Sequence, residues 1–63
     1  MTIREVRISK GLSQKELSYM TGVSIPMLSL IENGKREGTF KVLKAIGKAL
    51  ELTPSQLGEI FFS

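Results

Sequence analysis

The sequence predicts an all-α domain of five short helices. Apolar residues recur three and four positions apart along most of the chain, which is helical spacing, and no strand-like alternation extends beyond three positions. A Ser or Thr precedes each segment with this spacing, and the hydroxyl oxygens of these residues cap helix N-termini. A chain of 63 residues suffices for one small hydrophobic core. We therefore expect a single domain over residues 1–63.

The composition narrows the classes of function. The chain has no Cys and no His, which excludes a disulfide framework, the usual zinc sites and the common nucleophile–base pairs of enzymes. We therefore do not expect an enzyme. No apolar run approaches the roughly 20 residues of a membrane span, and a chain without disulfides suits the reducing cytoplasm, where we expect it to act. A net charge of +3 permits a polyanionic partner.

The first helix is expected over residues 3–10. Thr2 and Glu5 have the T-x-x-E spacing of a capping box, in which each side chain accepts a hydrogen bond from the other residue's backbone N–H. Gly11 marks the end of this helix, because glycine adopts positive φ at little cost. Ile8 lies off the apolar stripe and is expected to be exposed.

The second and third helices are expected over residues 14–21 and 25–32, with Ser13 and Ser24 as their N-caps. Gly22 lies where the chain reverses between them. Four residues of this segment are expected to face the interior: Leu17, Val23, Leu28 and Ile31. A helix, a short turn with Gly and a second helix form the arrangement that lays one helix in a DNA groove.

The fourth helix is expected over residues 40–50, with Thr39 as its N-cap. Its apolar stripe is predicted to consist of Phe40, Leu43, Ile46 and Leu50. Gly47 costs this helix roughly 1 kcal/mol relative to Ala, and a close approach of another helix explains its presence.

The fifth helix is expected over residues 54–61. Thr53 and Gln56 have capping-box spacing, and Pro54 occupies the first helical position, where its missing N–H costs no hydrogen bond. Leu57 and Ile60 are expected to face the core.

The segment from Leu12 to Lys35 resembles the Cro/phage-repressor type of helix-turn-helix protein, the XRE family. The resemblance rests on four motifs: Leu12-Ser13-Gln14, Glu16-Leu17, Gly22-Val23-Ser24 and Ile31-Glu32-Asn33-Gly34-Lys35. It extends from Ile3 to about Ile60. It implies a compact five-helix, lambda-repressor-like DNA-binding domain with its helix-turn-helix over residues 13–33. It further implies a transcriptional repressor that needs no cofactor and binds a palindromic double-stranded DNA operator as a homodimer.

The resemblance also implies which residues meet DNA. The base-facing positions are Ser24, Ile25, Pro26, Met27, Ser29 and Leu30. The positions at the DNA backbone are Ser13, Gln14, Lys15, Asn33, Lys35 and Arg36. For Ser13 and Gln14, capping of the second helix is an alternative that is compatible with a DNA contact.

The base-facing set consists of apolar residues and Ser, whereas many relatives carry Arg, Gln, Asn, Lys or Thr at several of these positions. Three interpretations stay open at this point. The protein reads A·T-rich sites through thymine methyls and DNA shape, or it binds mainly phosphates, or the apolar patch meets a protein partner. The last defines a second hypothesis for the function, an antitoxin-like or coactivator-like interaction module.

Two further roles follow from the resemblance. Arg7 on the first helix is expected to form a structural salt bridge with Glu32, since a partly buried carboxylate needs a charged partner; two separately solvated charges are the alternative. Ile60, Phe61 and Phe62 are the candidates for the dimer interface, because two adjacent Phe residues cannot both face one interior. The alternative there is a frayed, exposed tail.

Overall fold

The computed structural model describes residues 2–35 and 38–61, the last of them by its backbone alone. These residues form five helices and no strand. The helices are α1 (Ile3–Ser9), α2 (Gln14–Thr21), α3 (Ile25–Glu32), α4 (Phe40–Ala49) and α5 (Pro54–Phe61). The all-α prediction is confirmed. α1 and α4 each end one residue earlier than expected. Among the described residues, no helix combines the length and the apolar character that a bilayer span requires.

Every helix begins at the predicted Ser or Thr. In each case the hydroxyl oxygen accepts a hydrogen bond from the backbone N–H three residues on, at 3.0 to 3.3 Å. At α2 and α5 the side chain of the third helical residue accepts in return from the backbone N–H of the cap, at 3.0 and 2.9 Å. The capping box predicted for α5 is therefore confirmed, and α2 also has a box, between Ser13 and Glu16. The box predicted for Thr2 and Glu5 is incomplete in the described residues: the Thr2 hydroxyl accepts from the N–H of Glu5, without a return bond to the Glu5 carboxylate.

Three helices end in the same hydrogen-bonded turn, the Schellman motif. At the end of α3, the N–H of Lys35 donates to the carbonyl of Leu30 at 2.9 Å, and the N–H of Gly34 donates to Ile31 at 3.1 Å. Gly34 has φ +71° there. The same pattern follows α1 and α4, although after α4 the left-handed position is held by Glu51, with φ +57°.

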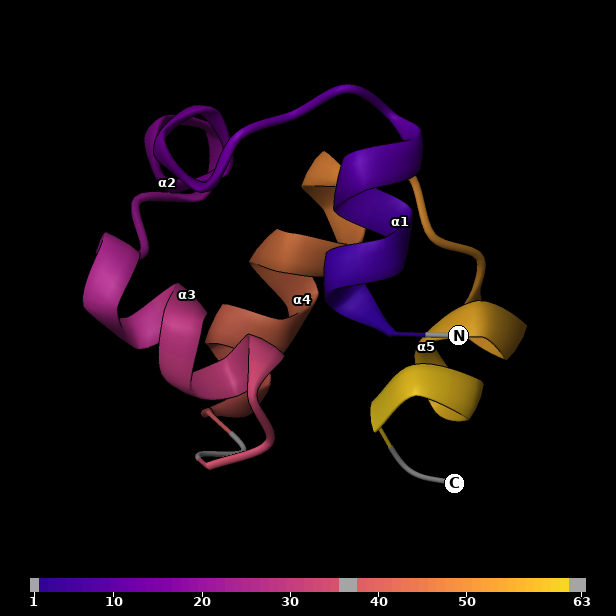
Figure 1. Ribbon diagram of the computed structural model, residues 1–63. Helices are drawn as coiled ribbons and strands as arrows, with labels where there is room; N and C mark the ends of the chain where they lie inside the picture. The colour runs from indigo at the N-terminus through magenta and orange to yellow at the C-terminus, as the bar shows by residue number, and fades with distance from the viewer. Residues whose placement is uncertain (1, 36–37, 62–63) are drawn as a thin grey trace.

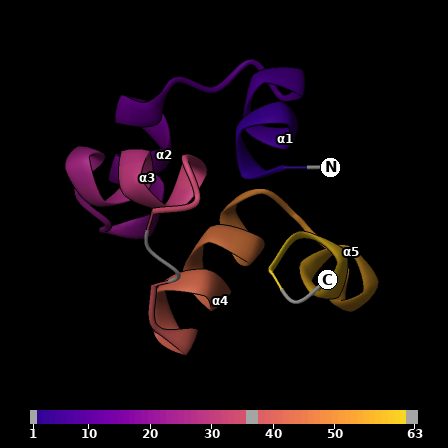
Figure 2. The ribbon, with the colours of Figure 1, turned by 60° about the horizontal axis from the view of Figure 1, so that its bottom comes forward.

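The core lies where α2, α3 and α4 meet. Leu17, Leu28, Ile46 and Leu50 are fully buried in it, and Val23 and Ile31 are nearly so. α2 packs against both α3 and α4. In two views α2 and α3 lie together on one side of the molecule, and α5 lies on the opposite side (Figures 1 and 2).

The apolar stripe of α4 is shorter than predicted. Leu43, Ile46 and Leu50 are buried, but Phe40 is 75% exposed, so its assignment to the core was wrong. Phe40 is the first residue of α4, one turn before Leu43, and at this end of the helix its side chain is left largely uncovered.

Gly47 marks the close approach of α5 to α4. A Cβ atom at this position would lie 2.6 Å from Cδ2 of Leu57. The glycine therefore leaves the space that Leu57 occupies, which confirms the expected reason for a glycine inside a helix.

Candidate nucleic-acid interface

The turn between α2 and α3 sets the angle between the two helices. Gly22 ends α2 in the left-handed conformation, with φ +74°, and its N–H donates to the carbonyl of Ser18. The Thr21 hydroxyl donates to the carbonyl of Leu17 at 2.8 Å and accepts from the N–H of Val23 at 3.2 Å. Val23 itself is buried. The turn is thus fixed by glycine, one hydroxyl and one core residue.

The inward side of α3 is held by the core and by an ion pair. Leu28 and Ile31 are buried, as predicted. The predicted ion pair is present: Nε of Arg7 lies 2.9 Å from Oε2 of Glu32, and Nη2 lies 3.2 Å from Oε1. The Glu32 side chain is only 2% exposed, so burying its charge costs desolvation free energy. The bidentate contact with the Arg7 guanidinium offsets this cost.

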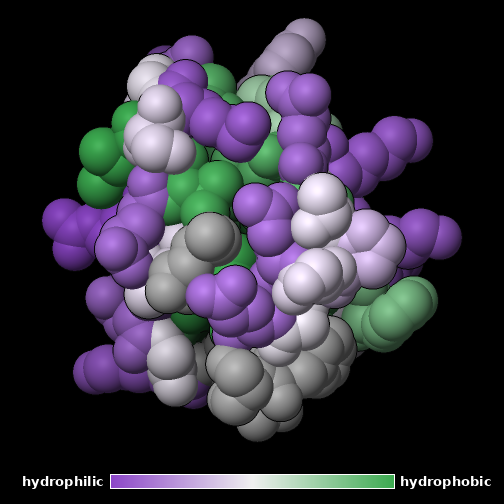
Figure 3. Space-filling view, turned by 90° about the vertical axis from the view of Figure 1, so that its right-hand side faces the viewer, coloured by the Kyte–Doolittle hydropathy of each residue, from purple (hydrophilic) through white to green (hydrophobic). Residues whose placement is uncertain are grey.

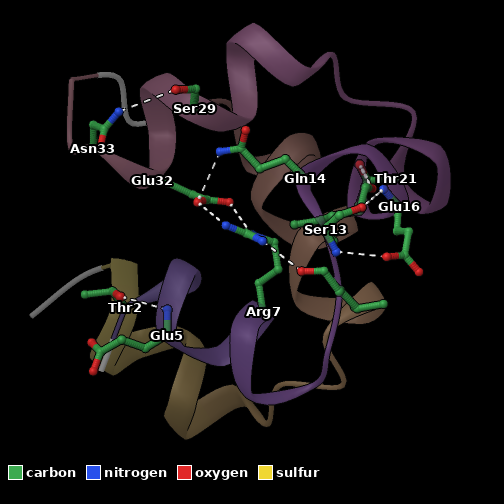
Figure 4. Close-up of polar contacts among 12 residues, drawn as sticks. Thr2, Glu5, Arg7, Ser13, Gln14, Glu16, Thr21, Ser29, Glu32 and Asn33 are labelled. Carbon is green, nitrogen blue, oxygen red and sulfur yellow. Dashed lines mark hydrogen bonds and ion pairs between the residues drawn. The ribbon is translucent and has the colours of Figure 1, made fainter.

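Two additional donors complete this polar cluster (Figure 4). Nη1 of Arg7 donates to the carbonyl of Leu12 at 2.8 Å, and Nε2 of Gln14 donates to Oε1 of Glu32 at 3.3 Å. α1, α2 and α3 therefore meet at one carboxylate. Gln14 was expected at the DNA backbone; in the domain itself, one of its amide hydrogens is directed at Glu32. Among the described residues, no buried side-chain nitrogen or oxygen lacks a partner.

The outward side of α3 carries no charge, and all of its residues except the half-buried Ser29 are exposed. We define the outer face of α3 as Ser24, Ile25, Pro26, Ser29 and Leu30. Ile25 is 41% and Leu30 38% exposed, large values for such apolar side chains. Met27, which was predicted to belong to this set, is half-buried and packs against the core. It lies four positions before Ile31 and so shares the inward side of the helix.

The two hydroxyls of the outer face are already hydrogen-bonded. Oγ of Ser24 accepts from the N–H of Met27 at 3.3 Å as the N-cap of α3. Oγ of Ser29 accepts from Nδ2 of Asn33 at 3.4 Å, a contact visible at the end of α3 in Figure 4. Asn33 is thus linked to α3 by its side chain, and Lys35 is exposed just beyond it. Arg36 lies outside the described residues.

At the start of α2, Ser13 and Glu16 hold each other. The N–H of Ser13 donates to Oε1 of Glu16 at 3.0 Å, and Oγ of Ser13 accepts from the N–H of Glu16 at 3.0 Å. The backbone N–H of Ser13, and after it the hydroxyl, lowers the pKa of Glu16 from its ordinary value of 4.5. Lys15 lies between them and is exposed.

A family model described as helix-turn-helix matches residues 3–57 of the chain. The chain belongs to this helix-turn-helix family. An uncharacterized HTH-type transcriptional regulator of Haemophilus influenzae is 40% identical over 48 residues, which cover 70% of this chain and 49% of the relative. The chain thus spans about half the length of that curated protein. No solved structure gives a significant match.

Beside its helix-turn-helix, the domain has an apolar surface that the sequence did not reveal. Tyr19 and Met20 of α2 are 92% and 51% exposed. An open hollow of about 280 Å³ lies at the surface beside the contact of α2 with α4 and is lined by Met20, Ala45, Lys48 and Ala49. The exposure of Tyr19 follows from its position opposite Leu17 on the helix. Met20 lies three positions after Leu17, so helical spacing alone assigns it to the inward side. Its exposure is evident only from the three-dimensional structure.

The expected dimer residues are only partly described. Ile60 is half-buried and packs against the core of its own domain, which leaves a part of its surface for a second subunit. The side chain of Phe61 and the whole of Phe62 lie outside the described residues. Within the described residues, no group of three or more acidic, His or Cys residues is placed to hold a metal ion.

Proposed function

We propose that this helix-turn-helix domain binds double-stranded DNA and regulates transcription, with α3 as the helix that enters the major groove. Family membership and the regulator name of the Haemophilus influenzae relative support this proposal. Helices of this kind present N-terminal residues to base edges while the preceding helix crosses the backbone.

One observation carries the proposal. α3 is fixed along one side by Leu28 and by the carboxylate of Glu32, and it is open along the other, where the outer face of α3 is exposed. A reading helix has to be rigid and accessible at once, because ordering it on binding costs free energy. In the chain, the positive N-terminal end of α2 with the exposed Lys15 comes before α3, and the exposed Lys35 comes after it. Both positions are suited to phosphates.

A homodimer on a palindromic operator, acting as a repressor, is the finer form of the proposal, with Ile60, Phe61 and Phe62 as the candidate dimer residues. α5 lies across the molecule from α3 (Figures 1 and 2), so a two-fold contact through α5 leaves α3 clear. The face that carries α1 and α5 shows apolar side chains between hydrophilic ones (Figure 3). Two-fold symmetry matches half-sites about one helical turn apart.

The exposed Ile25 and Leu30 favour a second candidate function, in which the outer face of α3 binds a protein. The two candidates differ in one observable. A DNA-binding domain retains duplexes at low salt and enriches a palindrome from a random pool, and a protein-binding module does neither.

The test replaces Lys35 and Arg36 together with Ala. We expect the double variant to bind all duplexes more weakly, because phosphate contacts are independent of sequence. The slope of log affinity against log salt is expected to fall by about 2, close to one per lost phosphate contact. Fluorescence anisotropy of labelled duplexes at several salt concentrations measures both quantities.

Lys44 and Lys48 of α4 provide the matched control, since replacing them removes the same charge from another helix. We expect that variant to keep most of the original slope. Equal slopes for the Lys35/Arg36 variant and the unaltered protein would contradict the placement of the loop after α3 on the phosphates.

A further inference from the structure

The outer face of α3 lacks the groups that read bases in pairs of hydrogen bonds. Arg or Lys recognises guanine through O6 and N7, and Asn or Gln recognises adenine through N6 and N7. None of these residue types occurs among the five residues of the face. A helix built this way cannot select a base by bidentate hydrogen bonding.

The nearest amide side chains lie outside this face, and each is held by a contact within the domain. Gln14 directs one amide hydrogen to Glu32, and Asn33 directs one to Oγ of Ser29. Ser24 and Ser29 each keep a hydroxyl proton to donate, but a serine hydroxyl suits several bases. The hydrogen bonds that remain are therefore poor discriminators.

The exposed apolar side chains are what remains for selecting a base. In the major groove the one apolar group on a base edge is the C5-methyl group of thymine. Ile25 and Leu30 are exposed on a helix whose other side is fixed by the core and the ion pair, so they are accessible to such a methyl group without a rearrangement of the helix. 5-Methylcytosine carries the same methyl group at the same ring position.

We infer that the outer face of α3 recognises 5-methylpyrimidines. It selects thymine and 5-methylcytosine over their unmethylated counterparts, uracil and cytosine, by apolar contact with the methyl group. The inference rests on the proposed DNA binding and names the chemical class of base that is read. It adds a property of the target: methylation of cytosine at a contacted position strengthens binding.

The test compares chemically altered duplexes. Random duplex pools are prepared with thymidine, with deoxyuridine in its place, or with 5-methyldeoxycytidine in place of deoxycytidine, and each is selected on the full chain. We expect the thymidine pool to enrich defined thymines and the deoxyuridine pool to enrich none at those positions. For a single selected duplex, each contacted thymine replaced by uracil should weaken binding about fourfold, the value of one buried methyl group.

Two comparisons separate methyl contact from other effects of uracil. At a contacted position, a 5-methylcytosine–guanine pair should bind about fourfold more tightly than an unmethylated cytosine–guanine pair. The double variant Ile25→Ala and Leu30→Ala should lose both differences. Ile8→Ala, an exposed apolar change on α1, should keep them.

The outcomes distinguish this inference from the proposed function. If duplexes are retained at low salt but uracil and 5-methylcytosine change nothing, methyl recognition is overturned and DNA binding stands. If no pool is retained at low salt, the proposed function fails and the inference fails with it.

Discussion

The inward and outward sides of α3 differ in what holds their side chains in place. On the inward side, Leu28 is fully buried and Glu32 accepts three hydrogen bonds from Arg7 and Gln14. On the outward side, Ile25 and Leu30 are exposed and carry no polar group. The inward side is rich in polar contacts, whereas the side proposed to bind DNA carries two serines and otherwise apolar residues.

This difference assigns two separate tasks to one helix of eight residues. The buried carboxylate joins three helices and fixes the position of α3, because a charge removed from water must keep its partners. The outer face of α3 has no buried charge that requires a partner, and it is available to a ligand. Changes on the inward side should therefore affect stability, and changes on the outward side should affect binding.

The largest expected effect is on the inward side. Glu32→Ala leaves the Arg7 guanidinium without its carboxylate in a nearly buried place, which costs about 3 kcal/mol of unfolding free energy. A domain of this size has roughly 3–5 kcal/mol in total, so the variant should be largely unfolded near physiological temperature. Thermal unfolding followed by circular dichroism measures the change.

Glu5→Ala is the matched control for Glu32→Ala. Glu5 is an exposed glutamate of α1 whose contribution is limited to the helix dipole, about 0.3–1 kcal/mol. Equal melting temperatures for the two variants would show that the contact between Arg7 and Glu32 does not stabilise the fold.

The smallest expected effect on stability is at the start of α2, outside both sides of α3. The pKa of Glu16 is lowered by the Ser13 hydrogen bonds, so ionised Glu16 stabilises the folded state above its ordinary pKa of 4.5. This contribution is lost as the pH falls through the lower pKa of the folded state. Glu16→Gln keeps the shape and removes the charge.

The unaltered protein should thus be slightly more stable than Glu16→Gln at about pH 7, and this difference in stability should shrink at about pH 3, below the ordinary pKa of Glu16. Urea unfolding at both values makes the comparison. A stability difference that stays constant between the two values would mean that the charge of Glu16 has no part in the cap.

Most of the helical framework was predictable because its signals are local. The N-cap residues, the glycine of the turn and the proline in the first turn of α5 each act within a few positions of the chain, and all five helices begin where these signals place them. The ion pair of Arg7 and Glu32 joins residues 25 positions apart. Its prediction came from the family resemblance and not from spacing.

The structure differs from the sequence predictions at positions whose surroundings depend on how the helices pack against one another. Phe40 has the spacing of a core residue, but its side chain is exposed. Sequence spacing does not show which part of α4 the other helices cover. Met27 shares a side with Ile31, which the base-facing assignment overlooked. The contact of Gln14 with Glu32 depends on how α2 meets α3, and that angle is a property of the assembled domain.

Two leucines of α3 test the central claim most directly, because they lie two positions apart on opposite sides of the helix. Leu28→Ala should cost about 2–5 kcal/mol of stability, whereas Leu30→Ala should change the unfolding free energy by about 1 kcal/mol or less. Thermal unfolding and duplex binding are measured for both variants. We predict that Leu30→Ala stays folded and binds its selected duplex at least about fourfold more weakly. A folded Leu30→Ala variant with unchanged duplex affinity would contradict the claim that the outward side of α3 meets DNA.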